Sequence, residues 1–435
     1  MRVVFAAAFL LRLALLAGAL HAGGPSVFYT ADSGEYLALA ASLVAEARFG
    51  SPAPELLHLP GYPLLLVPGV AFAHPAGVTL LLQAVLGSAT ASIAYATARR
   101  LGGPRAGLWA GLAYACEPVS LAWGGMLMAE TLLTTCVAWS VFCAVRYSQE
   151  GSARFLIGAC LAASAAAYVK PVAFLFPIWL GLLLVAWACA RREARPRLRP
   201  ALGYLVLASA LLSIWPVRNG LAGGFWGFSR QIEHASAAAA FRVAAASGAA
   251  RSREQRDALR REYLPPGVRS GVLDEATSRR VAATLWAQPL RLARIQLEGT
   301  LRTLFQPGAL PWLELFGTAR RDPELRLLIA TAGPEAAAAH VIGRAPAWAV
   351  LWPFLLAWNA AYMALAAFTL ARAGSERGNV LLVAAAALYF ALAGGGPWAQ
   401  SRFRHPLMPL VSALAGCSIA ARAGARDERK PDPVA

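Results

Sequence analysis

The stretch Tyr29-Thr-Ala-Asp32-Ser-Gly-Glu35-Tyr36 is the first polar segment after an apolar run from Arg2 to Leu20. That run has about the length, roughly 20 residues, that one membrane crossing needs. The stretch places two carboxylates beside two tyrosines in a chain that is 58% hydrophobic and only 14% charged. Average soluble domains carry roughly 25% charged residues. The composition therefore predicts a polytopic membrane protein, with this loop as the first position at the membrane surface where chemistry is expected.

Apolar runs divide the chain into about ten predicted membrane spans, with both chain ends in the cytoplasm and an uncleaved first span. The spans are expected at residues 2–20, 76–98, 106–121, 126–145, 155–169, 172–190, 201–217, 346–371, 380–393 and 406–421. In this register every short arginine-rich loop lies on the cytoplasmic side, as the positive-inside rule requires. The predicted fold class is an all-α polytopic membrane protein.

Two segments between the first and second spans are expected to stay at the outer membrane surface. Residues 36–44 carry apolar side chains at helical spacing, which predicts a short interfacial helix. The apolar piece that ends at His74 has only about a dozen residues, which is too short to cross, so it is expected to be re-entrant or half-buried.

These assignments divide the chain into three regions. Residues 1–217 form an N-terminal membrane module that includes the first external loop, 21–75. Residues 218–345 form an external, α-helical segment, whose arginines are compatible with this placement because long loops are exempt from the positive-inside rule. Residues 346–435 form the last spans and a basic cytoplasmic tail.

Several classes of function are disfavoured by the composition. The net charge is +17, but arginines cluster in short loops between apolar runs, and no soluble basic domain is present to bind nucleic acid. The six cysteines lie in apolar stretches without CxxC spacing, which excludes a zinc site of that kind and a disulfide framework. The histidines lack HExxH or HxxxH spacing, and no Gly-rich phosphate loop or GxSxG motif occurs. No cofactor is predicted, but a divalent cation held by Asp32 and a substrate phosphate stays open.

Three acidic residues are candidates for catalysis. Asp32 and Glu35 match a capping box ahead of an apolar helix, and a capped helix start would also hold Asp32 rigidly as a general base. Glu130 opens a predicted span at its outer end. Its charge complements the helix dipole there, but an acid at the boundary of a membrane bundle is also a functional candidate.

Cations gather at the outer ends of the predicted spans, opposite to the positive-inside bias. They are Lys170, Arg218 beside Asn219, and Arg402 and Arg404 beside His405. Single cations of this kind can extend to lipid phosphates. Several such groups on one side predict a phosphate bound at the bilayer surface, with arginine giving bidentate contacts and lysine a point charge.

In order and topology, these motifs resemble the GT-C superfamily of membrane glycosyltransferases, and within it glycosyltransferase family 39 and the related aminoarabinose transferases of bacteria. The motifs are Asp32-Ser-x-x-Tyr36, Pro60-Gly61-Tyr62-Pro63, Glu130, Lys170-Pro171, Trp215-Pro-Val-Arg218-Asn219 and Arg402-Phe-Arg404-His405-Pro406. The resemblance covers nearly the whole chain.

The resemblance implies a polyprenyl-phosphate sugar donor in a groove between the spans, an acceptor on the non-cytoplasmic face, and transfer with inversion. Asp32 would be the base, and Glu130 would position the substrate or a cation. The leaving phosphate would be neutralised by Lys170, Arg218, Arg402 and Arg404. Substrate contacts would come from Tyr36, Tyr62, His58, Asn219 and His405. The protein would lie in the bacterial inner membrane with its active site facing the periplasm.

Three points stay open. Family members often have a second acid directly after the first, whereas Ser33 follows Asp32 here, so either Asp32 or Glu35 can be the base. The acceptor can be a lipid, a glycan or a protein. A transporter or flippase of lipid-linked glycans and a polymerase or ligase that uses a pyrophosphate-linked donor are the alternative functions; transporters favour midplane charges and internal repeats, and the polymerase or ligase would depend on basic residues and a histidine such as His405.

Overall fold

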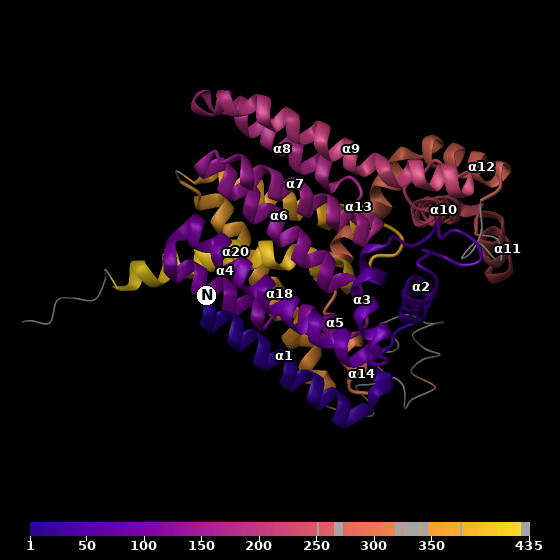
Figure 1. The fold of residues 1–435 in the computed structure, drawn as a ribbon, viewed down its shortest axis with the longest axis horizontal. Coiled ribbons are helices and arrows are strands. Elements are labelled where there is room, and N and C mark those ends of the chain that lie inside the picture. Colours follow the sequence, from indigo (N-terminus) through magenta and orange to yellow (C-terminus); the bar gives the residue numbers. More distant parts are fainter. Residues whose placement is uncertain are drawn as a thin grey trace, which may run out of the picture.

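The computed structural model describes residues 1–249, 252–264, 273–317, 324, 340, 347–374 and 376–427, and every element assigned in them is helical (Figure 1). The prediction of an all-α fold is confirmed. Six helical segments in these residues are long and apolar enough to cross a membrane: Arg2–Gly23, Pro75–Ala115, Pro171–Ala190, Glu193–Gly223, Val350–Arg372 and Ser401–Ala423. Three shorter apolar helices, Gly61–Ala71, Ala153–Val169 and Arg377–Ala393, accompany them. The number of ten spans stays a prediction.

The centre of the molecule is formed by α4 (Pro75–Ala115), α6 (Glu130–Glu150) and α20 (Met408–Asp427). Figure 1 shows α1 (Arg2–Gly23) on one flank and the pair α8 (Phe176–Ala190) and α9 (Leu198–Gly223) on the other. The remaining helices of the bundle are α7 (Ala153–Val169), α18 (Ala347–Arg372) and α19 (Arg377–Ala393). The core between them consists of buried aliphatic and aromatic side chains with many alanines, which lets the helix backbones approach closely.

Helix α4 folds back on itself at Gly102 and Gly103. Gly103 has φ 83°, a conformation that favours glycine, and Pro104 follows it. The second half of α4 then packs against the first: a Cβ atom on Gly107 would lie 2.8 Å from the carbonyl oxygen of Tyr95. The chain therefore turns within α4, as the predicted boundary between spans 76–98 and 106–121 requires.

Two predicted span boundaries are wrong. The span expected at 106–121 ends at Ala115, and a separate helix, α5 (Pro118–Gly124), follows. Proline disfavours helical geometry in the preceding residue, and Glu117 is extended, with φ −66° and ψ 115°. Its carboxylate accepts hydrogen bonds from the backbone N–H groups of Val119 (3.2 Å) and Ser120 (2.6 Å) and so caps α5. The span expected at 126–145 begins later, at Glu130.

One end of the bundle carries the first loop and the predicted external helices (Figure 1). The interfacial helix expected at 36–44 is helical, as α2 (Ser33–Glu46), and the apolar piece that follows it forms α3 (Gly61–Ala71). Near them lie α10 (Arg230–Ala244), α11 (Arg253–Tyr263), α12 (Glu275–Ala287), α13 (Pro289–Phe305) and α14 (Leu310–Leu315). The rest of the predicted external segment, at 250–251, 265–272 and most of 318–346, and the tail from 428 lie outside the described residues.

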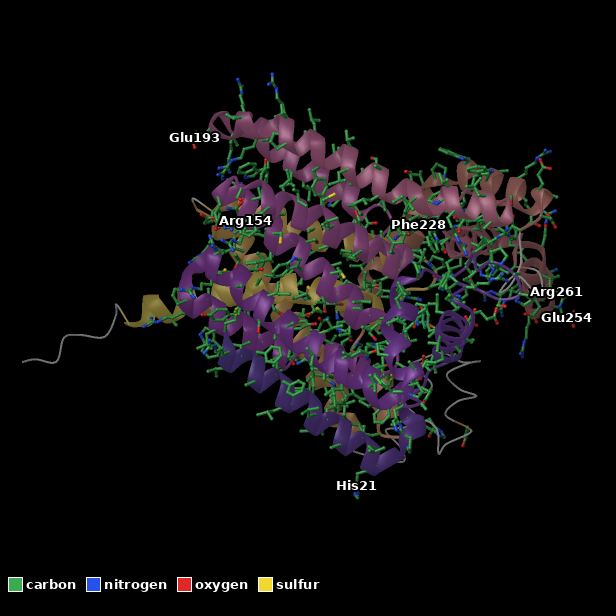
Figure 2. All side chains as sticks on the ribbon, in the orientation of Figure 1. His21, Arg154, Glu193, Phe228, Glu254 and Arg261 are labelled. Carbon is green, nitrogen blue, oxygen red and sulfur yellow. The ribbon has the colours of Figure 1, made fainter. Side chains whose placement is uncertain are left out.

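Figure 2 labels Glu254 and Arg261 at this end and Arg154 and Glu193 at the opposite end. The helices between these two ends run side by side, so each end presents a different set of connecting segments (Figure 1). The candidate catalytic residues come from the segments at the first of these ends: the first loop, the start of α6, the end of α7 and the turn before α20.

Candidate active site

Asp32 is the N-cap residue of α2, but its side chain makes no capping hydrogen bond. The capping box expected from Asp32 and Glu35 is therefore not formed. The neighbouring Ser33 fixes the helix start instead: its Oγ accepts from the backbone N–H of Thr30 (2.8 Å) and donates to the carbonyl of Leu127 (2.8 Å). This anchoring leaves the carboxylate of Asp32 available for a partner outside its own helix.

That partner is Arg402, which lies 370 residues away in the 3₁₀ segment η5 (Ser401–Leu407). Arg402 Nη1 donates to Asp32 Oδ2 at 3.0 Å, and the side chains are 22% and 42% exposed, respectively. The guanidinium also lies over the ring of Phe403, 5.1 Å from its centroid. The pair therefore remains accessible to a bound molecule.

A second ion pair, between Glu130 and Lys170, lies beside the first. Glu130 is the first residue of α6, Lys170 follows the last residue of α7, and both are buried. Lys170 Nζ lies 5.6 Å from the centroid of the same Phe403 ring. One oxygen of the Glu130 carboxylate, Oε2, is buried and has no hydrogen-bond partner among the described residues. An unpaired buried carboxylate oxygen is costly, and a bound group that donates to it would remove that cost.

His58 connects the two sides of the first loop. Its Nε2 lies 3.0 Å from Glu35 Oε2, and its Nδ1 lies 3.5 Å from Glu55 Oε1. Partial burial opposes ionisation of Glu55, but hydrogen bonds from His58 and from the backbone N–H of Leu57 hold the pKa of Glu55 below its usual value. Glu35 remains half exposed.

Two tyrosines form the floor of this loop. The ring of Tyr36 meets His58 edge to face, with centroids 5.2 Å apart, and meets Tyr62 in the same way at 4.9 Å. Burial raises the pKa of Tyr36, and the carboxylates of Glu130 and Asp32 raise it further, so its phenol stays neutral. Tyr62 donates to Gln83 Oε1 at 2.8 Å, and Gln83 donates to the carbonyl of Met126 at 2.7 Å.

The predicted residues Asp32, Glu35, Tyr36, His58, Tyr62, Glu130, Lys170 and Arg402 are thus gathered at one end of the bundle; we call these eight the loop cluster. Glu55 and Gln83 support it and were not predicted. The position of Glu55 three residues before a histidine was the only signal for its role. Gln83 is a polar residue inside an apolar helix, which marks it as unusual, but the sequence does not indicate which residue it would bond.

Arg218 and Asn219 have other contacts. Arg218 donates to the backbone carbonyls of Glu55 (2.6 Å) and Phe49 (3.1 Å). Asn219 is buried and donates to the carbonyl of Gly227 at 2.9 Å. These contacts hold residues 49–55 and 227–228 against the end of α9. The expected role of Arg218 in phosphate binding stays a prediction.

Arg404 and His405 also lie apart from Asp32. The guanidinium of Arg404 is buried. It donates to the carbonyls of Thr303, Leu304 and Gln306, at the C-terminal end of α13, at 3.2, 2.9 and 2.8 Å. His405 is buried with its Nε2 3.5 Å from the hydroxyl of Tyr114. Their expected contacts with substrate stay predictions. Across the described part of the chain, no three His, Cys, Asp or Glu side chains converge to form a metal site.

Comparison with known proteins identifies the architecture. A family model described as dolichyl-phosphate-mannose-protein mannosyltransferase matches residues 71–218, about a third of the chain. The crystal structure of the Archaeoglobus fulgidus oligosaccharyltransferase in complex with Zn and sulfate superposes with a TM-score of 0.55 at 13% identity. The match covers 98% of this chain and 50% of that chain. The chain has the GT-C fold.

A second structure of that archaeal enzyme, AglB, in complex with an inhibitory peptide and a dolichol-phosphate, gives a TM-score of 0.51 at 14% identity over 98% of this chain and 52% of that one. The present chain thus spans about half the length of these archaeal chains. ArnT from Cupriavidus metallidurans bound to undecaprenyl phosphate gives a TM-score of 0.42 at 16% identity over 99% of this chain and 81% of that chain. A search of curated proteins found no match. The predicted resemblance to the GT-C superfamily is confirmed at the level of the fold.

Proposed function

We propose that this protein is a membrane glycosyltransferase that moves a sugar from a polyprenyl-phosphate donor to an acceptor hydroxyl. The observation that carries the proposal is the pairing of the accessible Asp32 carboxylate with Arg402 beside the Glu130–Lys170 pair. The Asp32 carboxylate can serve as a base, and the two neighbouring cations, Arg402 and Lys170, can bind a phosphate. The GT-C fold supports this function, because a structural neighbour with that fold binds dolichol-phosphate and the matching family model describes dolichyl-phosphate-mannose enzymes.

In the proposed reaction Asp32 accepts the proton of the acceptor hydroxyl while that oxygen attacks the anomeric carbon. The bond from the anomeric carbon to the phosphate oxygen breaks on the opposite side, so the configuration inverts. The electron pair leaves with the phosphate, and negative charge grows there. Arg402 and Lys170 are the cations placed to stabilise that charge, which is where such groups act most strongly.

Donor binding also prepares the base in this proposal. In the unliganded protein Arg402 donates to Asp32 and occupies one oxygen of its carboxylate. A donor phosphate competes for the same guanidinium, since arginine binds phosphate and carboxylate by the same geometry. When the phosphate binds Arg402, the Asp32 carboxylate is released to accept a hydrogen bond from the acceptor hydroxyl, so proton removal follows donor binding.

Glu130 and Glu35 have supporting positions. The unpartnered Oε2 of Glu130 is assigned to hold a sugar hydroxyl or a cation. Glu35 is half exposed and fixed by His58, so it is the alternative base. The placement of the site on the periplasmic face of a bacterial inner membrane belongs to the same proposal, because the charge distribution of the short loops favours it.

The test is transfer of radiolabelled sugar from a set of polyprenyl-monophosphate donors to membrane acceptors by the full chain in nanodiscs. Asp32→Asn is expected to lower transfer by about 10²- to 10⁴-fold with donor binding retained, as loss of a general base predicts. Glu46→Gln, an exposed acid on the same helix α2, is the matched control and is expected to act as wild type. Parallel reactions with and without a chelator test for a cation between Asp32 and the phosphate.

Two results would overturn the proposal. Full transfer by Asp32→Asn removes the base assignment and leaves Glu35 or Glu130 for that role. No transfer by the wild type from any monophosphate donor, with transfer or movement of a pyrophosphate-linked glycan instead, would establish the polymerase, ligase or flippase.

A further inference from the structure

The end of the bundle opposite the loop cluster contains a groove of about 650 Å³ between α4, α18 and α20. It opens where α4 turns at Gly102 and where α18 ends at Arg372. Its walls are largely apolar and include Leu101, Phe368 and Cys417. The volume lies within the range of roughly 300 to 1,000 Å³ that is usual for ligand pockets.

Two arginines share one aromatic ring at this groove. The guanidinium carbons of Arg372 and Arg422 lie 4.4 and 4.5 Å from the ring centroid of Phe368. No carboxylate of the described residues forms an ion pair with either arginine. Among the described residues that line the groove, the one acid is Glu376, which accepts hydrogen bonds from Gln149 (3.2 Å) and Asn379 (2.6 Å). Among the described residues, the mouth therefore carries two cations that lie close together over one ring and have no ion-pair partner.

The groove and the loop cluster are separated by about two thirds of the thickness of a bilayer's hydrocarbon core. Helix α20 leaves η5 at Met408 and reaches the groove near Ala421, a rise of roughly 20 Å at 1.5 Å per residue. The hydrocarbon core of a bilayer is about 30 Å thick. A phosphate bound at Arg372 cannot reach Asp32, so the proposed donor phosphate is excluded as the ligand of this groove during transfer.

We infer that this groove binds an anionic phospholipid from the leaflet opposite the loop cluster. The headgroup phosphate would lie between Arg372 and Arg422, and an acyl chain would follow the apolar wall toward Leu101 and Cys417. Arginines placed near a membrane surface attract anionic lipids, and basic pockets between membrane helices bind their headgroups. The same positive charge disfavours occupation by a ligand that is only apolar.

The test is native mass spectrometry of the full chain released from nanodiscs that contain phosphatidylglycerol and phosphatidylcholine in equal amounts. The wild type is expected to retain one phosphatidylglycerol in preference to phosphatidylcholine. Arg372→Ala/Arg422→Ala is expected to weaken that retention by at least about tenfold, given the contribution of each cation near a lipid surface. The matched control is Arg154→Ala/Arg195→Ala, which removes two charges at the same end outside the groove and is expected to retain the lipid.

Four outcomes would overturn the inference. These are equal retention of the two phospholipids by the wild type, full retention by the Arg372/Arg422 variant, equal loss in both double variants, and displacement of phosphatidylglycerol by polyprenyl phosphate at lower concentration. Retention that appears only after residues 428–435 are removed would assign the groove to the chain's own C-terminal segment and would also overturn it. Thermal unfolding of each variant separates lipid loss from misfolding. Lipid retention is read without sugar transfer, so this result does not depend on the proposed activity.

Discussion

Arg402 and Arg404 are two residues apart in η5, but they lie in regions of opposite character. Around Arg402 a cation meets a carboxylate, Asp32, and both side chains are partly exposed. Around Arg404 a buried cation meets three backbone carbonyls at the end of α13. Hydrogen bonds to carbonyls satisfy an arginine without neutralising it, whereas an accessible ion pair can exchange its partner for a ligand. The difference separates an arginine that can bind substrate from one that holds the fold.

The geometry of η5 explains this separation. A 3₁₀ helix has three residues per turn, so each residue is rotated by about 120° from the one before. Residues 402 and 404 therefore point in different directions, and Phe403 lies between them. Lys170 belongs with Arg402 in this comparison, since it meets Glu130 and the same Phe403 ring. Arg218 belongs with Arg404, since it donates to the carbonyls of Glu55 and Phe49.

Among the variants that test this comparison of arginines, the largest expected effect is the loss of transfer in Arg402→Ala. Removal of a group that stabilises transition-state charge typically costs about 10²- to 10³-fold in rate. The side chain is partly exposed, so the thermal stability should change little. The measurements are the transfer rate and the midpoint of thermal unfolding. If Arg402→Ala were as active as wild type, the comparison would fail at its central point.

The Glu130–Lys170 pair tests the boundary between the two regions, since it is buried yet lies at the site. Lys170→Met should destabilise the protein by about 3 to 5 kcal/mol, because it leaves the Glu130 carboxylate buried without its cation. Glu130→Gln in addition should recover much of that stability but no transfer. Denaturant or thermal unfolding and the transfer assay measure the two properties separately. Recovery of both would mean that the pair is only structural.

Arg404→Ala is expected to show the reverse of Arg402→Ala. It leaves the carbonyls of Thr303, Leu304 and Gln306 without their donor in a buried position, at a cost of roughly 1 to 3 kcal/mol for each unsatisfied group that water does not reach. The variant should have a lower free energy of unfolding than wild type and faster hydrogen exchange at the end of α13. Transfer per folded molecule should be nearly unchanged at low temperature. A loss of donor affinity in the folded variant would instead return Arg404 to the phosphate site.

Much of the fold could be predicted because apolar runs and charge bias report directly on membrane helices. Glu130 and Lys170 were expected at the outer ends of spans because the apolar pattern breaks near them, and they lie at the start of α6 and directly after α7. The break at Glu117 and Pro118 was missed, since a hydropathy count does not register that proline excludes helical geometry in the residue before it.

The sequence indicated which residues belong to the candidate site, but not which of their side chains contact each other. Asp32 and Arg402 are 370 residues apart, and no pattern along the chain specifies their contact. Motif proximity grouped Arg402 with Arg404, whereas the backbone geometry of η5 separates them. Glu55 lies in a loop without periodicity, so its contact with His58 became visible only in three dimensions.

The smallest expected effect concerns Glu55. Its carboxylate contacts His58 of the loop cluster, and its backbone carbonyl accepts a hydrogen bond from Arg218. Because hydrogen bonds in the folded protein lower the pKa of Glu55, its ionised form contributes stability above the pKa of the unfolded chain, roughly 4.3, and that contribution is lost as the pH falls through the folded-state pKa. Glu55→Gln should therefore increase hydrogen exchange in residues 47–60 at pH 7, and the difference from wild type should shrink toward pH 4. Glu254→Gln, which changes an exposed acid on α11, is the control. A difference between variant and wild type that does not change with pH would contradict this prediction. It would show that the packing of the Glu55 side chain, and not its negative charge, supports His58.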